Sequence, residues 1–563
     1  MDPSGLGPQH AGLNIHCICN MITTRSGSFS IKESVIAVAL SLVAALCVSP
    51  YSGYLPDGQI TFKWIGAGIA FCATVIIEIL FSCTGTGNRT GLGGDIVDIR
   101  TIAIPFLVAF LIVTIHSLLQ VTRAVPVNSH NGYLVMAGFD NPAGAASAMA
   151  VSFPFVLALA DRLKDRRIRY AVMCGAFCVI IMILAVARSR VGILASGVVM
   201  VLWVIHTNNN VRAGRIVASI LAVLVIAAVV YMSFHKRGSN SGRALILGVC
   251  WDMFKDAPLF GHGLHGFRSQ YMLYQADYLE RSTSLVLPML ADNTTHPLNE
   301  YALLAVNSGL AGIVVLLSGV ILTIMHYLKN PGKESLVGMM VLAGIGVLSL
   351  FSYPFRYPST ILGLLSALML VYKDVLLRLT RTTIIVLRSI TTTVSVLGLF
   401  LIITWTGYQI QWGKLSEFSN NGKDTNAVIE GYNSLYPKLK YDPYFLFNYS
   451  YILSETGDYR KAGNMATESF DLMANYDTAL LIADNAKECG NIDTAEKYYW
   501  LASRMCPVRF IPLYALFCLF EDTGRQADMK MVGERILSKC IKVHSTEVRQ
   551  IISDVQMKLL INN

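Results

Sequence analysis

The sequence predicts an all-α, polytopic membrane protein: a bundle of about eleven transmembrane helices followed by an α-helical repeat domain. Three observations support this fold class. Of the 563 residues, 54% are hydrophobic and 14% are charged, and the mean hydropathy of +0.52 is too high for an ordinary soluble protein. Apolar runs recur that can each be extended to the roughly 20 residues of a spanning helix. After residue 412 the composition becomes polar and a short motif repeats.

The apolar runs lack the alternation of apolar and polar residues found in barrel strands, so helices are the expected spanning form. Basic residues gather in alternate short loops, and the positive-inside rule assigns these loops and the N-terminus to the cytoplasm. The loop over 235–297 and everything after residue 407 then lie outside. We expect a cytoplasmic tail over 1–33, a transmembrane domain over 34–412 and an external repeat domain over 413–563. The expected spans lie near residues 34–50, 63–83, 101–120, 142–160, 170–187, 191–206, 214–234, 298–327, 335–353, 358–377 and 385–406.

Composition also argues against two kinds of partner. The net charge of +9 does not indicate nucleic-acid binding, because the basic residues lie mainly in short loops between apolar runs. The twelve cysteines form no CxxC pair and no cysteine–histidine cluster with zinc spacing. Asp95 and Asp98 form a carboxylate pair, but they are placed in the cytoplasm, and we expect no metal site.

The polar C-terminal segment repeats with the period of tetratricopeptide motifs. Gly457, Gly490 and Gly524 stand 33 and then 34 residues apart, with apolar helical stripes on either side. In such repeats a glycine turns the chain between two paired helices, and small residues such as Ala462 and Ala495 allow close helix contact. We expect a solenoid of two to three repeats, the alternative being a helical cap without repeats. Either structure would serve to bind a partner rather than to catalyse.

Arginines lie at the external ends of the spans, where positive charge is not needed for orientation. Arg188 and Arg190 fall at the mouth between the fifth and sixth spans. They would either clamp an anion through guanidinium forks or extend to lipid headgroups, and composition supports both equally. Arg243 opens an amphipathic helix for which Ser241 is the expected N-cap. It then forms an anion site with the free N–H groups of the first turn, or is simply a solvated surface arginine.

A glycine-rich loop follows this helix. Gly261, Gly263 and Gly266 match G-x-G-x-x-G, but a helix rather than a strand precedes them, so a dinucleotide site is not expected. We interpret the glycines as a tight turn at the membrane surface, with His262 and His265 in structural or solvated roles.

His296 directly precedes a long apolar span. Histidine can accept a proton near neutral pH, as base catalysis on an acceptor hydroxyl requires. The alternative is that His296 caps the helix. Asp292 and Glu300 are nearby competitors for the role of base.

Taken together, these residues resemble the O-antigen ligase and polymerase superfamily over roughly residues 138–360. One position departs from the family, which commonly has asparagine directly after the histidine, where this chain has Pro297 and then Asn299 two positions later. The resemblance rests on Gly138-Phe-Asp-Asn-Pro142, Ser189-Arg-Val-Gly192, Arg243, Pro258-Leu-Phe-Gly-His-Gly-Leu-His-Gly-Phe267, His296-Pro-Leu-Asn-Glu-Tyr301 and Gly309-Leu-Ala-Gly312.

The resemblance implies a glycosyltransferase of the GT-C type in the bacterial inner membrane, with its repeat domain in the periplasm. It would act without metal or cofactor on an undecaprenyl-diphosphate-linked glycan. Arg190 and Arg243 would hold the diphosphate and His296 would accept the proton of the attacking hydroxyl, with inversion at the anomeric carbon. Arg188 and Arg356 are second-rank candidates for the diphosphate site. Arg190, Arg243 and His296 are expected to meet in one pocket at the external rim.

Three acceptors share this chemistry: the lipid A core (ligation), another repeat unit (polymerisation) and a protein hydroxyl. The external repeats would recruit a protein or carbohydrate partner, which slightly favours an attachment reaction over polymerisation. A membrane transporter is the alternative from a different class, but it would show inverted repeats and ionisable residues at the midplane, whereas the charges here gather at one face. A non-catalytic scaffold would leave the external arginines unexplained.

Overall fold

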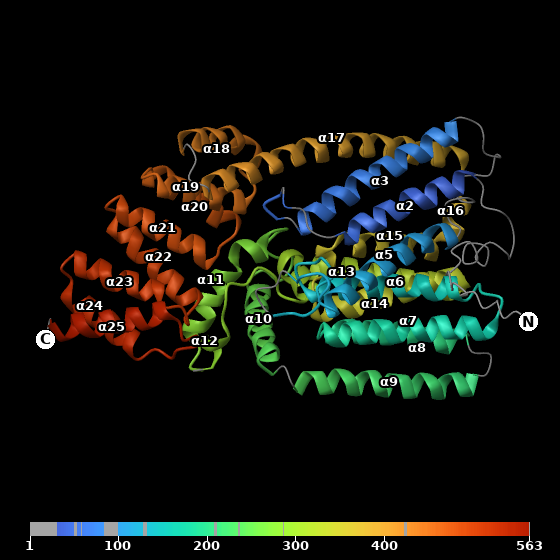
Figure 1. Cartoon of the computed structure of the whole chain (residues 1–563), viewed down its shortest axis with the longest axis horizontal. Helices are drawn as coiled ribbons and strands as arrows, with labels where there is room; N and C mark the ends of the chain where they lie inside the picture. The colour runs from blue at the N-terminus through green and yellow to red at the C-terminus, as the bar shows by residue number, and fades with distance from the viewer. Residues whose placement is uncertain are drawn as a thin grey trace, which may run out of the picture.

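The structure is a computed structural model, described here for residues 31–49, 53, 55–57, 59–83, 99–127, 132–207, 211–234, 237–284, 286–420 and 425–561. Within these ranges every regular element is a helix. The molecule is elongated, with a bundle of long helices at one end, the C-terminal helices at the other, and α10 to α12 between them (Figure 1). The Asp95–Asp98 pair and nearly all of the predicted N-terminal tail lie outside the described residues.

The predicted spans are confirmed as helices at each of the eleven expected places. In the described chain nine helices are long and apolar enough to cross a membrane, and two shorter apolar helices cover 33–48 and 358–371. The protein is therefore a multi-pass membrane protein. The helices are α2 (Ile31–Val48), α3 (Ile60–Cys83), α5 (Ile99–Val121), α6 (Pro142–Ala160), α7 (Arg166–Val186), α8 (Arg190–Thr207), α9 (Val211–Phe234), α13 (Glu300–Lys329), α14 (Lys333–Phe351), α15 (Pro358–Val371) with α16 (Lys373–Leu377), and α17 (Arg381–Asn420).

The centre of the bundle is α6, which is rich in alanine, glycine and serine and is almost entirely buried. Small side chains let neighbouring helices approach its backbone closely. At Gly192 of α8, an added Cβ would lie only 2.8 Å from the Cβ of Ala146 in α6. This close contact holds the first turn of α8, which carries Arg190, against the N-terminal half of α6.

The long helix α13 is interrupted by the glycine-rich loop. Gly309 has φ 59° and ψ −154°, which breaks the helical hydrogen-bond pattern. The loop fills the break: the amide of His262 donates to the carbonyl of Val306 (2.9 Å), and the amide of Leu310 donates to that of Pro258 (2.8 Å). A Cβ on Gly261, at φ +66°, would lie 2.4 Å from the backbone of Asn307. The glycines thus allow the backbone of the loop to pack directly against the backbone of α13. The ring of His262 has a structural role, because it donates to the carbonyl of Met253 (2.8 Å).

One predicted helix start is wrong. The amphipathic helix α10 (Arg237–Asp256) begins four residues before Ser241, so Ser241 is not its N-cap and Arg243 lies in the second turn. Only two residues separate the end of α9 from the start of α10, so α10 begins before the predicted N-cap. The dipole argument for Arg243 therefore does not apply. In Figure 1, α10 lies crosswise to the spans at the end that faces the C-terminal helices.

The C-terminal helices form the predicted repeats rather than an irregular cap. Gly457, Gly490 and Gly524 lie in the turns of three successive helix pairs, with φ of +85°, +74° and +68°. Ala462 and Ala495 are fully buried where the paired helices meet. The pairs are α19 (Pro443–Glu455) with α20 (Tyr459–Leu472), α21 (Tyr476–Glu488) with α22 (Ile492–Met505), and α23 (Ile511–Asp522) with α24 (Gln526–Leu537); α18 (Thr425–Leu439) precedes them and α25 (Thr546–Ile561) follows.

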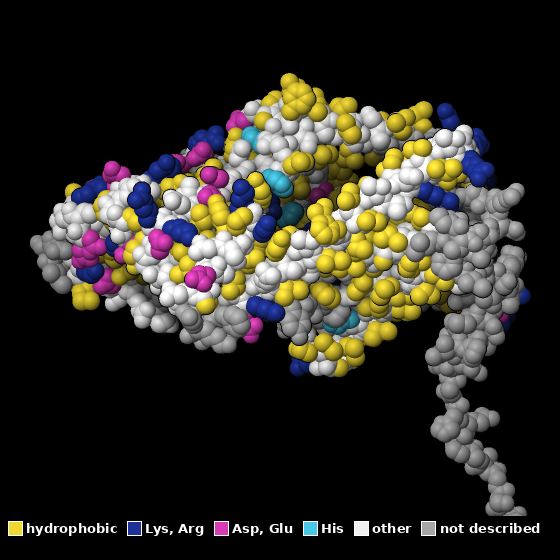
Figure 2. Space-filling model, turned by 90° about the horizontal axis from the view of Figure 1, so that it is seen from above, with side chains coloured by type: hydrophobic (Ala, Val, Ile, Leu, Met, Phe, Trp, Pro, Cys, Tyr) yellow, Lys and Arg dark blue, Asp and Glu magenta, His cyan; other side chains and the backbone are white. Residues whose placement is uncertain are grey.

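The repeat helices join the bundle in two places. Helix α17 continues through residue 412, the expected domain boundary, as far as Asn420 and contacts α18. In addition, α11 (Gly266–Arg281) packs on α20 and α22, and its Phe267 and Tyr271 share one apolar core with Phe470 and Ile482. Figure 2 shows charged side chains gathered over the repeat half of the molecule and hydrophobic side chains over the bundle.

Candidate functional site

Three of the predicted arginines line one small cavity at the end of the bundle nearest the repeats. Arg188 lies in the turn between α7 and α8, Arg190 is the first residue of α8, and Arg243 comes from α10. Together with Asn141 and Tyr353 they line a cavity of about 200 Å³. Segments far apart in the sequence therefore bring several guanidinium groups to one place.

The electrostatics of this cavity favour an anion. Burial lowers the pKa of Arg243, and the neighbouring charge of Arg190 lowers it further. The Nε atom of Arg243 is buried and has no hydrogen-bond partner among the described residues. A buried N–H donor without an acceptor is costly, and an anion with several oxygen acceptors would remove this cost.

The backbone around the cavity is strained. Arg188 has φ 53° and Leu298 has φ 55°, in the left-handed region that residues with side chains seldom adopt. Both residues line the arginine cavity. Such strain persists only where the surrounding structure enforces it, and it clusters at functional sites.

His296 does not line the arginine cavity. It lines a second, larger cavity of about 910 Å³ together with Arg268 and Arg356. Tyr353 links the linings of the two cavities. It lines the arginine cavity, and its ring stacks on that of His296 at a centroid distance of 5.2 Å. The expected single pocket is thus a pair of neighbouring cavities with an aromatic contact between them.

The environment of His296 keeps its ring uncharged. Burial, and then the charges of Arg356 and Arg268, lower its pKa from 6.5 to about 4. Its Nδ1 atom is buried and has no hydrogen-bond partner among the described residues. Helix capping does not account for this residue, because Asn299 is the N-cap of α13 and accepts from the amide of Ala302 (2.9 Å). A neutral imidazole beside a cavity has a lone pair that can accept a proton, and the lowered pKa makes it a weaker base than a free histidine.

The competing carboxylates are engaged elsewhere. Asp292 forms an ion pair with Arg509 of the repeat domain (3.2 Å). Glu300 accepts from the amide of Phe355 (3.3 Å) and lines a separate, apolar cavity between α13 and α14. Among the described residues, no cluster of three or more His, Cys, Asp or Glu side chains has the arrangement of a metal site.

Arg356 lies on the His296 side and is already paired. Its guanidinium contacts Asp140 (3.3 Å), which also accepts from the hydroxyl of Tyr357 (3.0 Å). Arg356 therefore has a carboxylate partner and lines the cavity of His296, not the arginine cavity. Sequence reasoning missed Asp140, which stands inside the quoted Gly138–Pro142 motif, and Arg268, which directly follows the glycine-rich loop.

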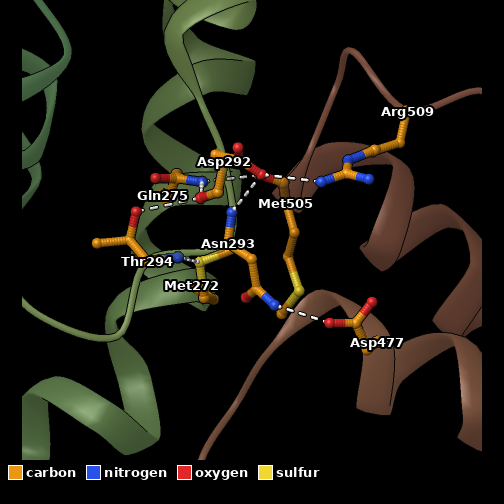
Figure 3. A network of polar contacts seen from close by, with 8 residues as sticks. All are labelled: Met272, Gln275, Asp292, Asn293, Thr294, Asp477, Met505 and Arg509. Carbon is orange, nitrogen blue, oxygen red and sulfur yellow. Dashed lines mark hydrogen bonds and ion pairs between the residues drawn. The ribbon is translucent and has the colours of Figure 1, made fainter. Parts of the chain in front are cut away.

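The segment that leads to His296 is held by the repeat domain (Figure 3). The side chain of Asn293 donates to Asp477 (3.0 Å), beside the Asp292–Arg509 ion pair. The side-chain amide of Gln275 on α11 donates both to the backbone carbonyl of Asp292 (3.1 Å) and to that of Met505 (2.8 Å). The position of His296 thus depends on contacts with the repeats.

Comparison with known proteins gives one family. The family model described as O-antigen ligase matches residues 175–317, which include Arg188, Arg190, Arg243 and His296 but not Arg356. No curated protein matches the sequence. Among solved structures, the crystal structure of yeast Tom70 aligns with 84% of this chain and 94% of its own, at 9% identity and a TM-score of 0.26.

Proposed function

Because residues 175–317 form an O-antigen ligase family domain, we propose that the protein transfers a glycan from an undecaprenyl-diphosphate donor to an acceptor hydroxyl. The observation that carries this proposal is the arginine cavity, where Arg243 is half-buried near Arg190 and its buried Nε atom has no hydrogen-bond partner among the described residues. A lipid-linked diphosphate offers the anionic oxygens that such a site lacks.

In the proposed mechanism, Arg190 and Arg243 bind the diphosphate, with Arg188 as a further contact. As the bond between the anomeric carbon and the diphosphate oxygen breaks, negative charge grows on the leaving group. The guanidinium groups stabilise this charge more strongly in the transition state than in the ground state, which is the requirement for catalysis. The lipid diphosphate then leaves with the bonding electron pair.

His296 supplies the base on the acceptor side. The acceptor oxygen attacks the anomeric carbon as its proton moves to the neutral imidazole of His296. Because the acceptor would enter from the cavity of His296 and the diphosphate would leave toward the arginines, attack and departure occur on opposite sides of the anomeric carbon. The product then has inverted configuration.

A place for the lipid chain adjoins the arginine cavity. An apolar cavity of about 820 Å³ lies between α13 and α14. Consecutive residues of α14 line the two cavities, Leu348 the arginine cavity and Ser349 the apolar one. A polyprenyl chain in this groove would have its diphosphate end near the arginines.

We place this end of the bundle outside the cytoplasm of the bacterial inner membrane, on the basic-residue pattern of the loops. Ligation is our first assignment for the reaction. Polymerisation of repeat units and transfer to a protein hydroxyl use the same donor chemistry and are the alternatives within the superfamily.

The test is a reaction of the purified protein with an undecaprenyl-diphosphate glycan in excess EDTA. Mass spectrometry should detect release of undecaprenyl diphosphate at the same rate as without EDTA. A strict requirement for added Mg²⁺ or Mn²⁺ would contradict the arginine mechanism. The product separates the acceptors, because it is a glycosylated core lipid, a lengthened carrier-linked chain or a glycoprotein.

A further inference from the structure

We propose that the cavity beside His296 is the acceptor subsite, and that a corner of the repeat domain binds the carbohydrate of the acceptor there. This inference rests on the proposed function and adds the part of the repeat domain that would bind its second substrate. The corner is the turn between α18 and α19 with the start of α19, residues 438–448, and we call it the α18–α19 corner.

The residues that line the cavity come from several parts of the chain, and they include Asp57 and Thr61, which lie before and in the first turn of α3. On one side are Thr295, His296 and Arg268, from the loop before α13 and from α11. The other side is made by the end of α17 and by the α18–α19 corner, which contributes Lys438, Tyr441, Asp442, Tyr444 and Asn448. Figure 2 shows a hollow between the repeat half and the bundle in which a histidine side chain is visible. The repeats therefore complete the space in which the proposed base would meet its substrate.

The corner is fixed in position rather than loosely attached. The guanidinium of Arg268 lies over the ring of Tyr444 at 5.7 Å, so the two walls contact each other across the cavity. Asp442 caps α19 by accepting from the amides of Tyr444 and Phe445. The indole of Trp412 on α17 donates to the side chain of Asn448 (3.3 Å), which joins the two elements of this wall.

The wall offers the groups that bind sugars. Tyr444 is 51% exposed and Tyr441 is 78% exposed, and each ring has a cation over one face, Arg268 over Tyr444 and Lys440 over Tyr441, which leaves the opposite face for a sugar. Gln409 of α17 is only 3% exposed, and its Nε2 atom has no hydrogen-bond partner among the described residues. A carbohydrate has apolar C–H faces that can lie on tyrosine rings and hydroxyl groups that can satisfy a buried amide.

The size of the cavity favours a glycan over a folded protein. A volume of about 910 Å³ lies in the range of roughly 300–1,000 Å³ found for small-ligand pockets. A stable protein partner would instead need an interface of roughly 800 Å² on each side. We therefore assign the cavity to a short oligosaccharide, and a peptide acceptor becomes an outcome of the test.

The test compares Tyr444→Ala with Tyr451→Ala. Tyr451 is also 51% exposed and lies two turns further along α19, about 10 Å away, without lining the cavity. The acceptor probe is the oligosaccharide released by mild acid from the envelope glycolipid of the same cells, with a serine-rich peptide as the alternative. At saturating donor, Tyr444→Ala should raise the KM for the oligosaccharide at least tenfold and change kcat less than threefold. Tyr451→Ala should change neither constant.

Equal kinetics of the two variants would overturn the inference while leaving the transferase proposal intact. Transfer to the peptide and not to the oligosaccharide would overturn it as well. Binding is measured separately through the fluorescence of Trp405 and Trp412, which line the cavity. If the wild type releases no undecaprenyl diphosphate, the proposed function fails. A saturable, Tyr444-dependent fluorescence change on adding the oligosaccharide would still support the carbohydrate site, and no change would reject it.

Discussion

Replacing Arg243 with alanine tests the arginine cavity most directly. The variant removes one guanidinium from a cavity that it shares with Arg190 and Arg188. It leaves the apolar face of α10, formed by Leu245 and Met253, in place. The structure therefore predicts a loss of turnover without a loss of folded protein.

The size of the effect follows from the contacts that Arg243 can make. A hydrogen bond to a charged group contributes about 1.5–3 kcal/mol, and a bidentate guanidinium would make two with the diphosphate. The loss is then about 3–6 kcal/mol of transition-state stabilisation. At 1.36 kcal/mol per tenfold change in rate, kcat/KM should fall by roughly 10²- to 10⁴-fold.

The melting temperature of the Arg243→Ala variant should not fall with its activity. Because the charge of Arg190 and burial both act against the charged form of Arg243, removing that charge relieves the native state. The melting temperature of Arg243→Ala should therefore equal or exceed that of the wild type. Arg281→Ala is the control: Arg281 is 66% exposed and pairs with Asp252 on α10, a contact expected to contribute about 0–1 kcal/mol.

The assay measures undecaprenyl diphosphate release and thermal unfolding on the same detergent preparations. If Arg243→Ala keeps kcat/KM within threefold of the control, Arg243 does not bind the donor. If its melting temperature falls in parallel with its activity, the role of Arg243 is structural. Either result would refute the reasoning above.

Three further predictions concern the His296 side. His296→Ala should abolish transfer. In the wild type, because the imidazole must be neutral and its pKa is lowered to about 4, kcat/KM should fall only as the pH drops toward 4; a fall centred near 6.5 would contradict the buried base. Gln275→Leu removes the bonds to the carbonyls of Asp292 and Met505 and should destabilise the docked repeats by about 1–3 kcal/mol. Hydrogen exchange should then rise at residues 292–296, and unchanged exchange there would show that this network does not hold the loop.

Local sequence patterns were sufficient to predict much of the fold. The spans follow from runs of apolar residues, and the repeat turns follow from Gly457, Gly490 and Gly524, because only glycine adopts positive φ without strain. Charge at the ends of the spans also indicated the arginines, since a buried or interfacial cation needs a reason to be there. These signals lie within a few residues of each other, where sequence reasoning is strongest.

The division of the site into two cavities could not be predicted in this way. Tyr353, an ordinary aromatic residue in the sequence, lines the arginine cavity in the folded chain and stacks on His296 of the other cavity. The pairing of Asp140 with the Tyr357 hydroxyl joins residues 217 positions apart. Likewise Ser241 has the residue type of an N-cap, but the short connection from α9 starts the helix earlier. In each of these cases, tertiary contacts or the connection between helices override the local preference of the sequence.

The contacts of the repeat domain change what a domain deletion would mean. The repeats bind the segment before His296 through Asp477 and Arg509, and they bury Phe267 and Tyr271 of α11. Removing them would expose this apolar core and release the loop that carries the proposed base. Loss of activity on deletion would therefore not distinguish acceptor recruitment from loss of a properly placed His296. Only single substitutions at exposed positions of the α18–α19 corner, which leave both contacts intact, separate the two roles.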